Sequence, residues 1–279
     1  MSEQGEGSIR ILQEKAKITR KHIIQMIGKA GSGHVGPALS CADIISALYF
    51  NVLRLDPKDP QWEDRDRFIL SKAHGCAAQY AVLAERGFFP VEVLDTFCQL
   101  DSILGGHPDM LKVPGIEAST GSLGHGLSIG VGMAIAGKVD RKGYRVFVLL
   151  GDGENDEGAV WEGAMAASHY GLGNLIAIID RNRLQVDGWT EEVMNPEPLA
   201  DKWRSFGWFV QEINGHDMNE ILRALDVAAS GRERPAAIIA NTVKGKGVSF
   251  MENKVDWHYR GLSARETTQA LSELELVEG

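Results

Sequence analysis

The stretch YRVFVLLGDGENDEG, residues 144–158, decides the fold that this sequence predicts. It begins with an apolar run from Val146 to Leu150 and continues into Gly151-Asp152-Gly153. An uninterrupted apolar run is typical of a strand that is covered on both faces, because neither side is left to water. The stretch therefore predicts a buried strand that ends near residue 150 and a following turn that carries an acidic side chain.

Similar apolar runs follow on the C-terminal side, at 175–179, 208–210 and 236–240. Segments of helical length precede or separate them, at 157–170, 197–206 and 217–229. Helices of this kind connect neighbouring parallel strands by crossing over one face of the sheet. The alternation predicts an α/β protein whose mainly parallel sheet is flanked by helices.

The N-terminal part predicts two helices. Residues 9–30 mix apolar and charged residues in a helical pattern that stops before the glycine loop at 31–33. Ser40-Cys41-Ala42-Asp43 has the form of a capping box and predicts a second helix that runs to about Leu53. We expect residues 1–279 to form a single domain with an N-terminal helix and a short C-terminal tail.

Composition excludes some classes of partner. The formal net charge of −9 disfavours nonspecific binding to nucleic acid or to anionic membranes, because both repel an acidic surface. The polar N-terminus and the lack of a long apolar run predict a cytoplasmic protein that does not enter membranes. Cys41, Cys76 and Cys98 follow no metal-ligand spacing, so we expect reduced thiols with packing roles.

Asp152 and Asn182 each follow a predicted strand. Because parallel strands end at one edge of the sheet, both side chains are expected at the edge where such folds bind ligands. Their oxygens suit Mg²⁺, and Gly151 and Gly153 allow a diphosphate to approach the backbone. A lone GDG more often only shapes a turn, but the position of Asn182 favours a metal site.

Several other segments place glycine beside a polar residue. Four histidines lie in such segments: His34, His74, His107 and His125. Their spacing fits no zinc pair, so hydrogen bonding, proton transfer or binding of sugar hydroxyls suits them better, although each alone could be an ordinary turn residue. The segment 120–126 predicts either a backbone surface that packs against a flat ring or a loop that leads into a helix. The segment 244–247 predicts either a phosphate-binding site or a solvent-exposed turn.

These segments, in order, resemble the amino-terminal half of transketolase from about residue 10 to about residue 262. The matching elements are SGH at 32–34, SKAHG at 71–75, GGHP at 105–108, TGSLGHG at 120–126, GDGENDEG at 151–158, DRN at 180–182, KGKG at 244–247 and WH at 257–258. Two departures are His125, where many relatives have glutamine, and Tyr259-Arg260, which separate His258 from Gly261.

The resemblance implies a thiamine diphosphate-binding fold and a set of site residues. Mg²⁺ would be held by Asp152, Asn182 and the backbone carbonyl of Leu184. The diphosphate would be contacted by Gly153, His74, Lys244 and His258, and the aminopyrimidine would be bordered by Gly121, Ser122 and Leu123. Substrate would face His34, His107 and His258, which exchange protons with its hydroxyls, while Glu157 would lie at the subunit interface, near the glutamate that activates the cofactor.

The implied reaction is transfer of a two-carbon ketol unit from a ketose phosphate to an aldose, as in pentose phosphate metabolism. Too few residues follow Lys244 for the pyrimidine-binding and third domains of transketolase. We therefore expect the N-terminal subunit of a split enzyme that forms a heterotetramer with a second chain. The alternatives are a ketol transferase for a branched or sulfonated sugar, a deoxyxylulose phosphate synthase relative, and a noncatalytic homologue.

Overall fold

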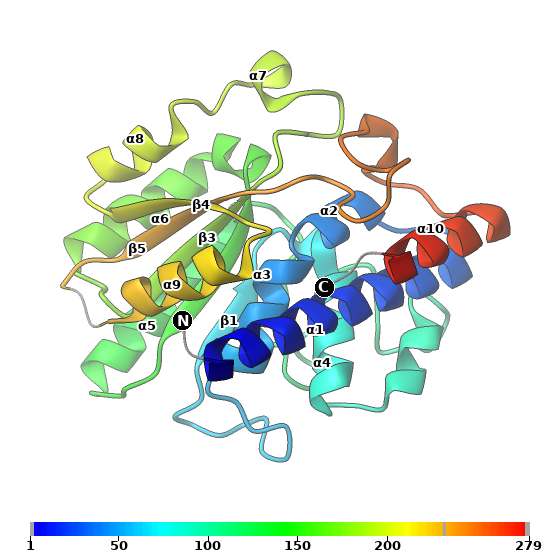
Figure 1. Cartoon of the computed structure of the whole chain (residues 1–279). Coiled ribbons are helices and arrows are strands. Elements are labelled where there is room, and N and C mark those ends of the chain that lie inside the picture. Colours follow the sequence, from blue (N-terminus) through cyan, green and yellow to red (C-terminus); the bar gives the residue numbers. More distant parts are fainter. Residues whose placement is uncertain (1–2, 231–232, 277–279) are drawn as a thin grey trace.

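Five parallel strands form the centre of the molecule, a computed structural model that describes residues 3–230 and 233–276 (Figure 1). The strands are β1 (Arg67–Leu70), β2 (Val146–Gly151), β3 (Leu175–Arg181), β4 (Phe209–Asn214) and β5 (Ala236–Asn241). Their order in the sheet is β1-β2-β3-β5-β4, and every neighbouring pair is parallel. This confirms the predicted fold class and the strands expected from the apolar runs.

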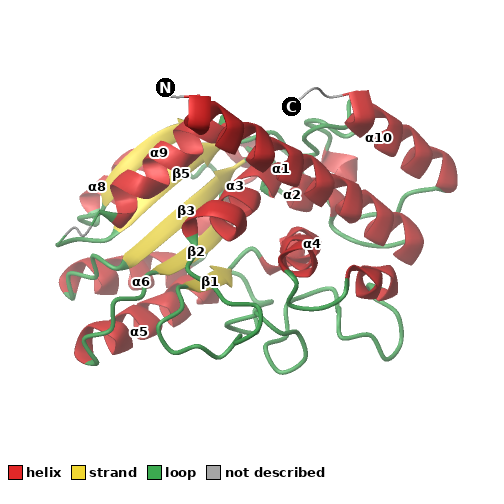
Figure 2. Cartoon of the chain, turned by 60° about the horizontal axis from the view of Figure 1, so that its bottom comes forward, coloured by secondary structure: helices red, strands yellow, loops and turns green. Residues whose placement is uncertain are grey.

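Helices cover both faces of the sheet (Figure 2). One face packs against α1 (Glu3–Ala30), α3 (Ala42–Ala47), α4 (Cys76–Arg86) and α9 (Met218–Ala229), and the other against α5 (His125–Val139), α6 (Gly158–His169) and α8 (Leu199–Ser205). Along β2, Phe147 and Leu149 face the first layer, whereas Val148 and Leu150 face the second. Both sides of the strand are buried, which explains its continuous apolar run.

The remaining elements are short, apart from one C-terminal helix. They are α2 (Val35–Ser40), a π-helical turn (Leu48–Val52), 3₁₀ turns (Ala73–Gly75, Val91–Thr96, Gly153–Asp156, Val255–Trp257), α7 (Thr190–Val193) and α10 (Ala264–Leu276). The expected C-terminal tail thus contains α10, which lies along α1 in Figure 1. No helix within the described ranges is long and apolar enough to cross a membrane.

The predicted capping box at Ser40 is wrong. Ser40 is the last residue of α2, and its hydroxyl donates to the Pro37 carbonyl at 3.0 Å and to the Asp180 carboxylate at 2.5 Å. Because the Ser40 hydroxyl is buried and bonds these two groups, it does not cap the following helix. The packing role expected for Cys98 is also wrong, because this residue is exposed, while Cys41 and Cys76 are buried.

Candidate active site

A cavity of about 380 Å³ lies where the carboxyl ends of β2 and β3 meet the loops from α2 and β5. Most residues singled out in the sequence line it: His34, His74, His107, Gly121, Leu123, Asp152, Gly153, Asn182, Leu184, Lys244 and His258. Ser122 and Glu157 are not part of the lining, and both are exposed. The fold therefore brings together residues from distant segments, and Asp152 and Asn182 lie together at the ends of β2 and β3, as expected from their positions after these strands.

Three candidate metal ligands belong to this lining. The buried Asp152 carboxylate accepts hydrogen bonds from the amides of Gly153 at 2.9 Å and Arg183 at 2.5 Å. The bond from Arg183 joins the two segments that carry the ligands, and Asn182 Oδ1 accepts from the Leu184 amide at 3.2 Å within one of them. Burial, together with the charge of Asp180, raises the pKa of Asp152 to about 6, so a nearby cation would relieve this carboxylate.

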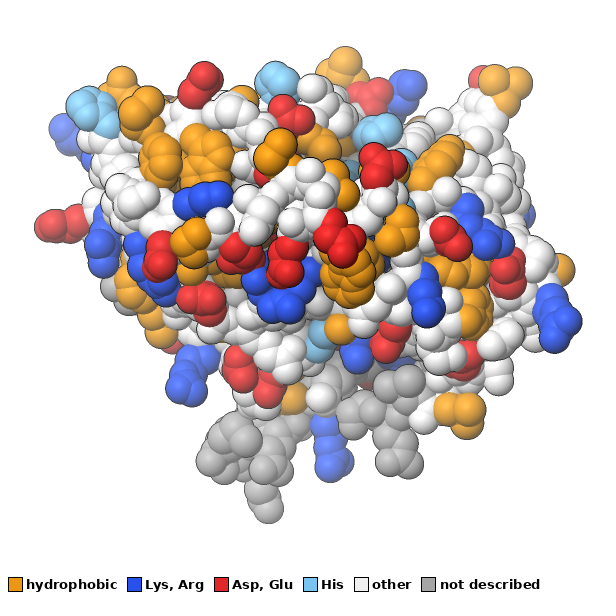
Figure 3. Space-filling model, turned by 90° about the horizontal axis from the view of Figure 1, so that it is seen from above, with side chains coloured by type: hydrophobic (Ala, Val, Ile, Leu, Met, Phe, Trp, Pro, Cys, Tyr) orange, Lys and Arg blue, Asp and Glu red, His pale blue; other side chains and the backbone are white. Residues whose placement is uncertain are grey.

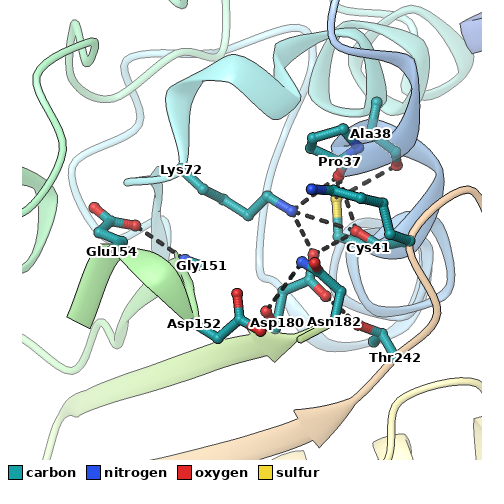
Figure 4. Close-up of polar contacts among 12 residues, drawn as sticks. Pro37, Ala38, Cys41, Lys72, Gly151, Asp152, Glu154, Asp180, Asn182 and Thr242 are labelled. Atoms are coloured by element: carbon teal, nitrogen blue, oxygen red, sulfur yellow. Dashed lines mark hydrogen bonds and ion pairs between the residues drawn. The ribbon is translucent and has the colours of Figure 1, made fainter. Parts of the chain in front are cut away.

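A buried ion pair lies behind the metal-ligand segment and was not predicted. Lys72 contacts Asp180, which also accepts hydrogen bonds from the hydroxyls of Ser40 and Thr242, and the Lys72 ammonium donates to the Pro37 carbonyl at 2.8 Å (Figure 4). Burial opposes both charges, but each partner offsets it, so the pKa of Lys72 is raised and that of Asp180 is lowered. An aspartate at the end of a fully apolar strand was the signal for such a partner.

Lys244 and His258 form a second polar pair. Lys244 Nζ lies 2.7 Å from His258 Nδ1 and donates to the Leu184 carbonyl at 2.7 Å. Burial lowers the pKa of Lys244 to about 7, and burial together with the Lys244 charge lowers the pKa of His258 to about 3. His258 is therefore neutral near pH 7 and can accept as well as donate a hydrogen bond.

The histidines from four different loops form one cluster. The ring of His34 lies 5.2 Å from His74, 5.5 Å from His258 and 6.4 Å from His107, centre to centre. Burial, followed by the charges of His107 and Lys244, lowers the pKa of His34 to about 4. His34 and His258 therefore present neutral imidazoles to the cavity near pH 7, which suits binding of hydroxyls and exchange of protons.

Tyr259 lies beside the histidine cluster and was not predicted as a site residue. Its ring lies 4.5 Å from that of His34, and its hydroxyl is 2.8 Å from the Ser32 hydroxyl. It borders a second cavity of about 320 Å³, which shares His34, His74 and His107 with the first. The remaining predicted histidine, His125, is exposed, lies outside both linings and has Nδ1 3.3 Å from the Ser122 carbonyl oxygen.

Comparison with known proteins identifies the family. A family described as "Transketolase, thiamine diphosphate binding domain" matches residues 11–276. The chain is 46% identical over 266 residues to one subunit of the apulose-4-phosphate transketolase of Phocaeicola vulgatus, covering 95% of this chain and 94% of the relative. It is also 46% identical over 264 residues to the 6-deoxy-6-sulfo-D-fructose transketolase subunit SqwG of Clostridium sp. (strain MSTE9), covering 95% and 96%.

Solved transketolases share the fold. The Campylobacter jejuni enzyme superposes with a TM-score of 0.90 at 33% identity, covering 100% of this chain and 44% of that one. The Leishmania mexicana enzyme gives a TM-score of 0.89 at 30% identity, covering 95% and 41%. The chain thus spans less than half the length of these enzymes but nearly the whole length of the two subunits. It belongs to the transketolase family and carries that family's thiamine diphosphate binding domain.

Proposed function

We propose that the chain binds thiamine diphosphate with Mg²⁺ in the 380 Å³ cavity and is the N-terminal subunit of a two-chain transketolase. The observation that carries the proposal is the convergence of one metal-ligand segment and one histidine cluster on a single cavity. A scaffold without activity has no need for this convergence, which disfavours the noncatalytic alternative.

The residues present fit both parts of the cofactor site. Asp152, Asn182 and the Leu184 carbonyl offer hard oxygens suited to Mg²⁺. Within the described ranges no group of three or more His, Cys, Asp or Glu residues could hold a metal, so a cation at this single carboxylate would depend on oxygens from a diphosphate. At Gly153 a Cβ would lie 2.8 Å from Gln185 Cγ, so a larger residue at this position would have to displace the Gln185 side chain, which also lines the cavity.

The other lining residues would bind and orient. His74, Lys244 and His258 would donate to the diphosphate, and Gly121 to Leu123 would border the aminopyrimidine. Thiamine diphosphate supplies the carbanion and the electron sink of the reaction. His34, His107 and His258 would hold the substrate hydroxyls and exchange their protons, while Glu157, exposed beside Gly124, would contact a neighbouring chain.

The proposed reaction is transfer of a two-carbon ketol unit from a ketose phosphate to an aldose. The two relatives at 46% identity are named for apulose 4-phosphate and for 6-deoxy-6-sulfo-D-fructose, which favours a modified sugar as the second candidate substrate. Both are named as subunits, which supports a partner chain with the pyrimidine-binding and third domains, and pairing about a two-fold axis would give a heterotetramer. A cytoplasmic location and a place in pentose phosphate metabolism stay predictions.

The test begins with calorimetry of thiamine diphosphate binding to the purified chain, with and without Mg²⁺. The chain is then mixed with its candidate partner and assayed with a ketose phosphate, apulose 4-phosphate and 6-deoxy-6-sulfo-D-fructose as donors. Mg²⁺-dependent binding and ketol transfer support the proposal. Absence of Mg²⁺-dependent binding contradicts the cofactor assignment, and binding without transfer from any donor supports the noncatalytic alternative.

A further inference from the structure

Glu154 is a buried carboxylate at the rear of the proposed cofactor site, with an exposed fraction of 2%. Its Oε2 accepts a hydrogen bond from the Gly151 amide at 3.0 Å (Figure 4). Its Oε1 accepts from the Gly124 amide at 2.9 Å and from the Ser71 hydroxyl. One side chain therefore links the end of β2, the residue after β1 and the loop that leads into α5.

Two of these linked segments, 121–123 and 151–153, contribute residues to the lining of the cavity. Gly151 precedes Asp152 and Gly153, which are proposed to hold the metal and the diphosphate. Gly124 follows the loop 121–123, which is proposed to border the aminopyrimidine. Their relative position determines whether one cofactor molecule can contact both at once, and Glu154 is the side chain that joins them.

The backbone at the start of α5 packs closely against neighbouring segments. Gly124 has φ +82°, and a Cβ at this position would lie 2.7 Å from Glu157 Cβ. A Cβ at Gly126 would lie 2.4 Å from Ser71 Oγ. A side chain at either glycine would collide with these neighbours, so the backbone here lies directly against the segments of Glu157 and Ser71.

A buried carboxylate is a costly way to join segments for stability alone. Glu154 forms no salt bridge within the described ranges, and its buried carboxylate is held by three hydrogen-bond donors, the amides of Gly124 and Gly151 and the Ser71 hydroxyl. Burial of a charge without a partner costs free energy, whereas charge-assisted hydrogen bonds fix geometry strongly. The cost of burying this carboxylate therefore indicates that its role is to fix the relative positions of the segments that it joins.

We propose that Glu154 is a positioning residue that fixes the ring-facing loop 121–123 relative to the metal- and diphosphate-facing turn 151–153. The proposal rests on the proposed function, since it assumes that thiamine diphosphate spans both segments. Glu154 acts through the backbone that it holds and exchanges no proton with the substrate.

The test compares two probes, thiamine diphosphate and inorganic pyrophosphate, each titrated calorimetrically with Mg²⁺ into the purified chain. Pyrophosphate occupies only the metal and diphosphate part, whereas thiamine diphosphate also needs the loop 121–123. In Glu154→Gln one acceptor oxygen becomes an amide that can only donate, so one of the two backbone amides loses its partner. We expect the ratio of thiamine diphosphate affinity to pyrophosphate affinity to fall about 10-fold or more.

Two further variants complete the design. Ser71→Ala removes one of the three donors and is expected to lower the same ratio about threefold, so it carries the test if Glu154→Gln does not fold. Glu14→Gln, an exposed residue on α1, is the matched control and should leave the ratio unchanged. Equal losses for both probes, or an unchanged ratio in Glu154→Gln and Ser71→Ala, would overturn the proposal.

The wild-type titrations separate this proposal from the proposed function. If neither probe binds the wild-type chain in a Mg²⁺-dependent manner, the cofactor assignment itself fails. If pyrophosphate binds and thiamine diphosphate binds no more tightly, the loop 121–123 makes no ring contact and the role of Glu154 is refuted while the diphosphate site stands. A preference for thiamine diphosphate that survives in both variants refutes Glu154 alone.

Discussion

Asp152 is the proposed metal ligand whose removal should have the largest effect. Asp152→Ala should abolish the Mg²⁺-dependent part of thiamine diphosphate affinity, a loss of about 100-fold or more, because Mg²⁺ would lose the one carboxylate among its proposed ligands. Calorimetry with and without Mg²⁺ measures this part directly. Asp201→Ala, exposed on α8, is the control, and an unchanged dissociation constant in Asp152→Ala would contradict the assignment.

Substitution of His107 distinguishes a role in substrate contact from a role in cofactor binding. It is exposed and lies at the outer side of the histidine cluster, in the lining of both cavities. His107→Ala should lower turnover of the reconstituted enzyme about 10²-fold, because a proton-transfer group is lost, while cofactor affinity stays nearly constant. Steady-state kinetics and calorimetry measure the two effects. Equal losses in both would place His107 in a diphosphate or structural role.

His34 should make the stability of the cofactor-free chain depend on pH. Its pKa is about 4 in the folded chain and about 6.5 when unfolded, so the unfolded state binds the proton first as the pH falls. The contribution of neutral His34 to the free energy of unfolding is complete above pH ~6.5 and is lost as the pH falls from ~6.5 to ~4. His34→Asn should reduce the loss between pH 7 and 5 by about 1 kcal/mol, allowing for partial solvent screening.

Urea unfolding of the cofactor-free chain at the two pH values measures this difference. His169→Asn serves as control, because His169 is exposed near the end of α6. The same loss of stability in His34→Asn as in the wild type would show that His34 takes up its proton equally in both states.

At the scale of the elements, α2 packs closely against the segments that carry Lys244 and His258. A Cβ at Gly36 would lie 2.6 Å from the Trp257 carbonyl oxygen and 3.0 Å from Lys244 Cγ. Gly36→Ala should therefore push α2 away from Lys244, destabilise the chain by about 1–3 kcal/mol and weaken cofactor binding. Thermal unfolding and calorimetry test both effects.

The matched control lies on another helix. A Cβ at Gly132 in α5 would have no neighbour within 4 Å, and the residue is exposed. Gly132→Ala in the purified chain should therefore raise stability by about 0.5–1 kcal/mol, because alanine favours the helix. Similar destabilisation by both substitutions would mean that the effect at Gly36 reports helix content and not contact with the site.

Sequence periodicity predicted the elements whose burial is uniform. β2, β3 and β5 are apolar on both faces, so their patterns were unambiguous. β1 was missed because it has only four residues and begins with Arg67. At the site, Asp152 and Asn182 could be placed together because parallel strands end at one edge, but the contact of Ser40 with Asp180 joins residues far apart in the sequence and has no local pattern.

At the scale of the whole molecule, charge does not mark a partner surface on the face that Figure 3 shows. Figure 3 shows acidic and basic side chains interspersed over one face, with histidines among them. A surface that meets a second chain near Gly121 to Leu123 and Glu157 should be apolar and rich in glycine. Gly121 and Ser122 are exposed there, and α6 exposes Met165 at 60%, with Tyr170 following at 52%. That this surface meets a second chain stays a prediction.

The purified chain alone should show no ketol transfer and should become active with a partner chain of about 300 residues that carries two further α/β domains. The resemblance to transketolase implies that a glutamate bonded to the pyrimidine would help to activate the cofactor. The acidic residues that line the 380 Å³ cavity are Asp152, Glu154 and Asp187. The first is the proposed metal ligand, the second is saturated by its three donors, and the third is exposed in the loop after Leu184.

None of these three acids is therefore placed to serve as the base for the pyrimidine, which is why we expect a second chain to supply it. The assay mixes the chain, the candidate partner, thiamine diphosphate, Mg²⁺, a ketose donor and an aldose acceptor, with each protein omitted in turn. The Asp152→Ala chain plus partner is the matched control and should stay inactive. Full activity of the chain without a partner would contradict the two-chain enzyme and would require a base among the residues of this chain.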